Sequence, residues 1–124
     1  MQAKLLILVL SLLLGTMTHA QTYYVKENQT YEQPIIDKLI ELNQKVTTKR
    51  ENSEYTIECI VEKSSTERTR GHLIIIDTKT GDIIATSAEE KGGDNQYTGK
   101  KAGTVIMQKI AKNELATLLL KSKR

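Results

Sequence analysis

The sequence predicts an α+β domain built as a two-layer sandwich, with two helices on one face of an antiparallel sheet. Apolar residues recur with helical spacing in two segments, one that begins near residue 34 and one near the C-terminus. The region between them alternates apolar and polar residues and contains a compact turn between two β-branched stretches. The predicted order is therefore α-β-β-β-α with a three-stranded sheet, and an additional N-terminal strand would make the sheet four-stranded.

Residues 1–20 have the layout of a secretory signal peptide. One early cation, Lys4, precedes an apolar core at residues 5–14, and a short run of small and polar residues leads to Ala20. This core is shorter than the roughly 20 apolar residues that a membrane-spanning helix needs. We therefore expect export to the periplasm or the cell exterior, with cleavage after Ala20 and Gln21 as the first mature residue.

The rest of the 124-residue chain is long enough for one domain with a modest core. We expect residues 21–33 to form an arm or edge strand, residues 34–121 to form the α+β domain, and residues 122–124 to form a basic tail. The leader contains one cation and no acid, so the remainder carries one charge less than the formal net charge of +3. Such a mild excess does not by itself predict a polyanionic partner.

The first helix is expected to begin at Pro34, because the fixed φ and missing N–H of proline suit a first helical turn. An apolar stripe then follows at the spacing i, i+4, i+7 and i+11, which is typical of one helix face. The polar run at residues 47–53 is predicted to end the helix. The stripe consists of Ile35, Leu39, Leu42 and Val46.

The central region is predicted to form three strands. Residues 55–63 alternate apolar and polar side chains, as in a strand with one buried face. Residues 71–77 and 82–87 are predicted to form a hairpin, since Asp77 can accept from the backbone two residues ahead and Gly81 can adopt a positive φ. These strands are apolar at successive positions. Either both sheet faces are partly covered, or one face is a surface for a partner.

The C-terminal part is predicted to be a loop followed by one helix. Residues 89–98 form the loop, and Thr98 is placed to cap a helix that runs to about Lys121. This helix combines an apolar stripe with a basic opposite face and a basic end. Cations in its last turn interact favourably with the helix dipole, which gives them a structural reason to be there.

No catalytic, metal-binding or nucleotide-binding motif is found, and we expect a protein that is not an enzyme and holds no cofactor. One histidine outside the leader, His72, and one cysteine, Cys59, are too few for a zinc site. No Gly-x-Ser-x-Gly element identifies a serine nucleophile, and residues 89–95 lack the spacing of a calcium loop. A small secreted enzyme or enzyme inhibitor is an alternative, which would need a concave pocket that gathers His72 with an acid.

Two further residues have modification chemistry. Cys59 has no partner for an intramolecular disulfide, and its place on the apolar side of a strand predicts a buried small hydrophobe. An intermolecular bridge or a reactive thiol is the alternative for Cys59. The tripeptide beginning at Asn28 fits the sequon for N-glycosylation, which matters only in a eukaryotic source.

The segment 71–85 resembles the central hairpin of small bacterial cell-envelope domains, with a strand ending at Asp77 and a turn closed by Thr80 and Gly81. These domains include the curli-export lipoprotein group and the lipoprotein activators of penicillin-binding proteins. The resemblance extends over residues 34–120, through the preceding helix and strand and the C-terminal helix. It implies an accessory or assembly role without catalysis. The lipid-attachment cysteine of those lipoproteins is missing here, so a membrane anchor is not implied.

The order α-β-β-β-α, with Gly99-Lys100-Lys101-Ala102 at the start of the last helix, is also similar to the double-stranded RNA-binding domain. In that family, lysines at the start of this helix contact phosphates across the major groove. The resemblance implies that role for Lys100 and Lys101.

We expect an exported, non-catalytic binding or assembly-accessory protein whose partner is a protein of the cell envelope or the exterior. The candidate contact surfaces are the basic end of the last helix, the segment 64–70 and an exposed sheet face. The candidate partner-binding residues are Arg68, Arg70, Lys100, Lys101 and Lys112.

Overall fold

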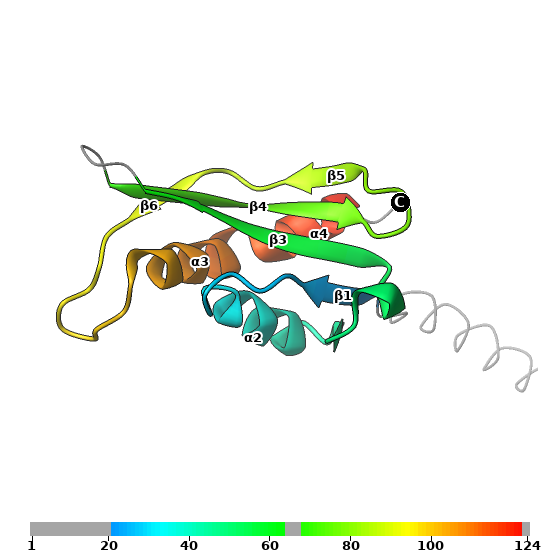
Figure 1. Ribbon diagram of the computed structural model, residues 1–124, viewed down its shortest axis with the longest axis horizontal. Helices are drawn as coiled ribbons and strands as arrows, with labels where there is room; N and C mark the ends of the chain where they lie inside the picture. The colour runs from blue at the N-terminus through cyan, green and yellow to red at the C-terminus, as the bar shows by residue number, and fades with distance from the viewer. Residues whose placement is uncertain (1–20, 64–67, 123–124) are drawn as a thin grey trace, which may run out of the picture.

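The computed structural model describes residues 21–63 and 68–122. The predicted signal peptide at residues 1–20 lies outside this description, as do residues 64–67 and 123–124. Figure 1 shows two layers, a sheet and a set of helices that lie against one of its faces. The α+β class predicted from the sequence is confirmed, whereas the predicted composition of the two layers is wrong in several places.

The sheet is mixed and six-stranded, not three-stranded and antiparallel as predicted. Its strands are β1 (Thr22–Val25), β2 (Lys45–Thr47), β3 (Tyr55–Glu62), β4 (Thr69–Asp77), β5 (Ile83–Thr86) and β6 (Glu90–Gly92). The strand order is β2-β1-β3-β4-β5, and β6 pairs with β4 beyond the end of β5. Only the pairs that involve β1 are parallel.

Three α-helices, rather than the two predicted, lie together on one face of the sheet (Figure 1). A short 3-10 helix precedes β3. The helices are α2 (Gln33–Glu41), η1 (Arg50–Asn52), α3 (Ala102–Asn113) and α4 (Leu115–Ser122).

β1 is an inner strand and not the predicted arm or edge strand. It pairs with β2 on one side and with β3 on the other. Tyr23 and Val25 are buried in the core, and Tyr24 between them is half-exposed, as expected for a strand with one buried face. The prediction failed because the outer neighbour, β2, has only three residues and lies in a segment assigned to a helix.

α2 ends at Glu41, whereas the apolar stripe predicts a helix as far as Val46. Asn43 follows the helix with a left-handed φ of 60°, a conformation that asparagine tolerates and that often ends helices. The N–H of Gln44 then donates to the carbonyl of Leu39 at 2.9 Å. Val46 still packs against the core, but it does so from β2. Val46 therefore has the spacing expected of a helix residue, although it lies in a strand.

Residues 89–98, predicted as a loop, contain the strand β6. Buried Ser87 keeps the chain beside β4, because its hydroxyl accepts from the N–H of Leu73 (2.8 Å) and its own N–H donates to the Leu73 carbonyl (2.9 Å). β6 then pairs with the beginning of β4, which starts at Thr69. His72 consequently lies within β4, half-buried, and not at the end of a strand.

α3 and α4 replace the single last helix predicted to begin at Thr98. α3 begins at Ala102, and Asp94 acts as its cap: Oδ1 of Asp94 accepts from the N–H of Ala102 at 2.8 Å. Glu114 departs from helical geometry, with φ −122° and ψ −33°, and separates the two helices. The Glu114 carboxylate accepts from the N–H of Ala88 at 3.2 Å, which ties this break to the chain that follows β5.

The strand predicted at residues 55–63 and the hairpin that follows it are confirmed. β3 and β4 pair antiparallel along the whole of β3. In the turn between β4 and β5, Oδ1 of Asp77 accepts from the N–H groups of Lys79 (2.9 Å) and Thr80 (3.0 Å). Gly81 has a φ of 79°, the left-handed conformation expected at that position.

The core lies between the sheet and the helices. Cys59 is buried there with 4% of its surface exposed, as predicted. α3 comes close to β4 at Gly71, where a Cβ atom would lie 2.8 Å from Cγ2 of Ile106 and 2.8 Å from the carbonyl oxygen of Ile60. The large apolar side chains that are fully buried are Tyr23, Ile35, Leu39, Ile57, Leu73, Ile75, Ile106, Met107, Ile110 and Leu115.

Candidate functional site

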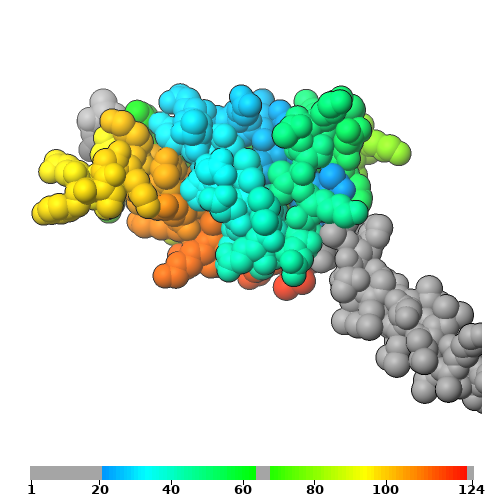
Figure 2. All heavy atoms as spheres, turned by 90° about the horizontal axis from the view of Figure 1, so that it is seen from below, coloured from blue at the N-terminus to red at the C-terminus, as the bar shows by residue number. Residues whose placement is uncertain are grey.

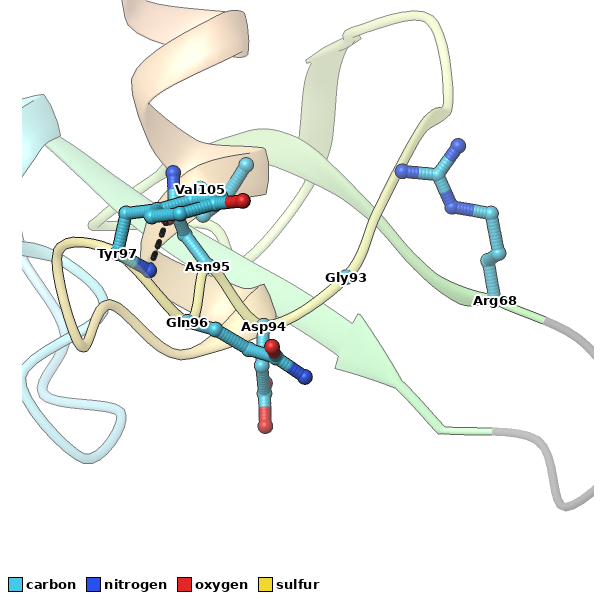
Figure 3. Close-up of a pocket in the computed structure, with 7 residues that line it drawn as sticks. All are labelled: Arg68, Gly93, Asp94, Asn95, Gln96, Tyr97 and Val105. Carbon is cyan, nitrogen blue, oxygen red and sulfur yellow. Dashed lines mark hydrogen bonds between the residues drawn. The ribbon is translucent and has the colours of Figure 1, made fainter.

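The loop between β6 and α3 projects from one end of the molecule, as Figure 2 shows from the helix side. An open depression of about 440 Å³ lies against this loop. In Figure 3, Arg68 stands on one side of it and Asn95 and Tyr97 on the other. We call Arg68, residues 93–97, Lys100 and Lys101 the tip surface. The depression itself is lined by Arg68, Gly93, Asp94, Asn95, Gln96, Tyr97 and Val105.

Hydrogen bonds close the loop on itself. Oδ1 of Asn95 accepts from the N–H groups of Tyr97 (2.9 Å) and Thr98 (3.2 Å). The N–H of Gly99 donates to the Asn95 carbonyl (2.8 Å), and the N–H of Asn95 donates to the Lys100 carbonyl (2.8 Å). Gly99 has a φ of 74°, which glycine adopts at little cost. The loop predicted at residues 89–98 is thus, in this part, a closed turn organised around Asn95.

Asp94 joins this turn to the helix below it. Its Oδ1 atom is the acceptor for the first N–H of α3, at Ala102, although eight residues separate the two in sequence. A carboxylate at this position also interacts favourably with the positive end of the helix dipole. The base of the loop is therefore fixed to a helix that is itself packed into the core.

Tyr97 is fully exposed at the end of this closed turn. Arg68, Lys100 and Lys101 are exposed as well. Among the residues that the structure describes, no carboxylate lies within ion-pair distance of these three cations. Tyrosine and arginine are the residue types, with tryptophan, that most often dominate the energy of protein interfaces. The surface can therefore bind a partner through an aromatic ring and unpaired positive charges.

The structure brings only part of the predicted set to this surface. Arg68 lines the depression, and Lys100 and Lys101 belong to the loop. Arg70 lies within β4 and forms an ion pair with Glu89, with 3.7 Å between Nη1 and Oε1.

Lys112 belongs to a different surface. It lies about 16 Å from Lys101 along the axis of α3. There it lines a depression of about 320 Å³ between α2 and α3, which also contains the carboxylates of Asp37 and Glu41. Lys112 is therefore not part of the tip surface.

Tyr97 is the residue that sequence reasoning missed. Its neighbours Asn95, Gln96, Thr98 and Gly99 are polar or turn-forming residues. A large aromatic side chain within such a run has no apolar neighbour in sequence with which to be buried. This isolation was the available signal that Tyr97 would be exposed.

A second depression, of about 340 Å³, lies where β1 ends and β3 continues. Nδ2 of Asn28 donates to the carbonyl of Cys59 at 2.7 Å, so a side-chain amide continues the hydrogen bonding that β1 had provided. The N–H of Asn28 donates to Oε1 of Glu32 at 2.9 Å. The nitrogen that a glycan would occupy in the sequon is therefore already engaged with the backbone of β3.

We expect Asn28→Ala to lower the free energy of unfolding by about 1–2 kcal/mol, because the Cys59 carbonyl loses its donor in a partly buried position. Urea denaturation of the two proteins measures this difference. Asn52→Ala is the matched control, since Asn52 is exposed and its side chain is free of such a bond in the described structure. Equal stability of the two variants would contradict the role given to Asn28.

The Cys59 thiol does not have the environment of a reactive cysteine. Burial, and to a smaller extent the charges of the nearby carboxylates of Glu32 and Glu58, raise the pKa of Cys59 from 9.0 to about 12. Because the thiolate is the reactive form, a thiol with this pKa stays protonated near neutral pH. The environment thus favours the expected structural role over an intermolecular bridge.

The described part of the chain holds no group of three or more His, Cys, Asp or Glu side chains arranged to bind a metal ion. Within those same residues, no helix combines the length and the apolar character needed to cross a membrane.

Comparison with known proteins adds one structural likeness. No family model matches this chain. No curated protein sequence matches it either. Among solved structures, the chain is similar to a minor lipoprotein from Acinetobacter baumannii, with 11% sequence identity and a TM-score of 0.47. The superposition covers 84% of this chain and 94% of that chain. A likeness of this degree carries no argument about function.

Proposed function

We propose that this chain is an exported, non-catalytic binding protein that takes part in an assembly of the cell envelope by contacting a partner protein through the tip surface. The layout of residues 1–20 supports export. The hairpin resemblance to envelope accessory domains supports the accessory role. The observation that carries the proposal is the full exposure of Tyr97 on a hydrogen-bonded turn beside unpaired cations.

A closed turn is well suited to binding. A loop that is already ordered loses little conformational entropy when a partner packs against it. A tyrosine supplies a large contact area and has few rotatable bonds to immobilise. The side chains that line the depression offer positive charge, amides and an aromatic ring. Its one carboxylate, on Asp94, is engaged in capping α3. This composition favours recognition over catalysis.

The RNA-binding alternative loses the element order on which it depended. The chain has two further strands before β3, and β1 pairs in parallel within the same sheet. Lys100 and Lys101 nevertheless precede a helix, so RNA is retained as a competing ligand in the experiment below.

We expect a photo-crosslinking residue, benzoylphenylalanine, placed at position 97 of the full chain to join it in the native cell to one recurrent envelope protein. The adduct should disappear when Arg68→Glu is added. Benzoylphenylalanine at position 79 is the matched control, because Lys79 is exposed in the turn at the opposite end of the molecule (Figure 1). Tyr97→Ser should leave the free energy of unfolding within about 0.5 kcal/mol of the original, since the ring is fully exposed.

The absence of a specific adduct at position 97, or the same adducts at positions 97 and 79, would overturn the proposal. The stability measurement on Tyr97→Ser separates a loss of binding from a loss of folding.

A further inference from the structure

We infer that the tip surface recognises an acidic segment of its partner, with the Arg68 guanidinium paired to a carboxylate and Tyr97 packed beside it. This inference rests on the proposed function, because it names the chemistry of the partner that the same surface would bind.

The tip surface carries three exposed cations, and one of them, Arg68, lines the depression. Lys26, Lys38 and Arg70 each form an ion pair, at 3.6, 3.4 and 3.7 Å respectively. Arg68, Lys100 and Lys101 have no such partner among the described residues. The loop that lines the depression contains one carboxylate, on Asp94. One oxygen of this carboxylate accepts a hydrogen bond from the first N–H of α3. A partner carboxylate would therefore meet positive charge that is not already neutralised.

The depression has the shape to receive a protruding segment. It is open and has a volume of about 440 Å³, with Arg68 on one wall and Gln96 and Tyr97 on the other (Figure 3). The planar guanidinium of arginine can donate two parallel hydrogen bonds to one carboxylate. The Gln96 amide can donate to a second oxygen, and the Tyr97 ring can cover the aliphatic part of an aspartate or glutamate.

The same observations favour an acidic peptide over an anionic membrane or an RNA duplex. Binding in a membrane interface requires an apolar face that enters the lipid, and Tyr97 is a single aromatic residue on an otherwise polar turn. Recognition of an RNA duplex extends over roughly 16 base pairs and needs cations spread along the contact. Here Arg68, Lys100 and Lys101 belong to one end of the molecule, and Lys112, the other predicted cation on α3, lies in a separate depression with Asp37 and Glu41.

The test uses a fluorescein-labelled 12-residue peptide rich in Asp and Glu, and the same peptide with Asn and Gln in their places. Binding to the full chain is measured by fluorescence anisotropy, and NMR of the ¹⁵N-labelled chain locates the contact. We expect the acidic peptide to bind at least tenfold more tightly than its amide counterpart. Chemical shifts should change at residues 93–101 and at Arg68, and binding should weaken as the salt concentration rises.

Two variants of Arg68 distinguish the paired hydrogen bonds of its guanidinium from the effect of its positive charge alone. Arg68→Gln should weaken binding of the acidic peptide at least tenfold, and Arg68→Lys should restore only part of it, because lysine cannot form the paired hydrogen bonds. Lys79→Gln removes one positive charge at the other end of the molecule and should change the affinity less than twofold. Full recovery in Arg68→Lys would overturn the paired geometry.

Three results would overturn the inference as a whole: equal affinity for the acidic and amide peptides, tighter binding of vesicles containing phosphatidylglycerol, or tighter binding of a 20-base-pair RNA duplex. If position 97 crosslinks to a partner while the acidic peptide fails to bind, the proposed function stands and this inference falls. If the peptide binds but no envelope protein is crosslinked, the proposed function fails instead.

Discussion

Replacing Gly71 by alanine is expected to lower the free energy of unfolding by about 3 kcal/mol, the upper end of what overpacking in a core usually costs. The added Cβ would lie 2.8 Å from the carbonyl oxygen of Ile60 and 2.8 Å from Cγ2 of Ile106. The first of these atoms belongs to the backbone of β3, so it cannot move aside by a change of rotamer. β3 and β4 must separate locally to relieve the contact with Ile60, and Ile106 on α3 must also shift to relieve the other contact.

Urea denaturation compares this variant with Gly93→Ala. Gly93 has no heavy atom within 4 Å of the position where a Cβ would stand, and its φ is not in the left-handed region. The control should be neutral or slightly stabilising, because alanine has less backbone freedom to lose on folding. If Gly71→Ala proves as stable as Gly93→Ala, α3 does not approach β4 as closely as described.

Raising the pH from 9 to 12 is expected to destabilise the fold steeply. Burial raises the pKa of Cys59 from 9.0 to about 12 and the pKa of Tyr23 from 10.0 to about 12. A hydrogen bond with Ser122 opposes the shift of Tyr23, and charges on Tyr55 and Glu54 add to it.

The direction of the effect follows from proton linkage. The unfolded chain releases these two protons near their ordinary pKa values, while the folded chain keeps them until about pH 12. The folded state therefore has its full stability below about pH 9. Above that pH each group contributes a loss of up to about 1.4 kcal/mol per pH unit, until its folded pKa is reached.

Urea midpoints measured from pH 8 to pH 11 test this expectation, with Cys59→Ala as the informative variant. Removing the thiol should delay the onset of the loss by about one pH unit and leave the slope that belongs to Tyr23. The variant also starts from a lower stability, because a buried sulfur is replaced by a smaller group. A stability that stays constant up to pH 11 would show that these groups are not as buried as described.

The parts of the fold that the sequence predicts correctly are those determined by residues close to one another in the chain. The hairpin depends on Asp77 and Gly81, which act within five residues, and the side chains of β3 alternate along the strand itself. By contrast, β1 and β2 are four and three residues long and become strands only through parallel pairing with distant segments. Val46 has the spacing of a helix residue because both a helix and β2 can deliver an apolar side chain to the same core.

The candidate site divides in a similar way. Arg68, Lys100 and Lys101 are found by composition, since a cluster of cations can be read from the sequence. Their separation from Lys112 and the pairing of Arg70 with Glu89 depend on tertiary structure and cannot be read in that way. The closure of the turn around Asn95 joins the carboxylate of Asp94 to a helix eight residues later, and no local rule predicts that choice over a cap at Thr98.

The sheet ends at both sides in very short strands, with three residues in β2 and four in β5. Such a border offers an incoming chain few backbone hydrogen bonds, and Lys45 adds a charge at the β2 side. Ile83, which is 60% exposed on β5, is an apolar side chain on this edge and is the position where another chain would pack most readily. The purified protein should accordingly resist fibril growth at millimolar concentration, and a lysine in place of Ile83 should extend that resistance.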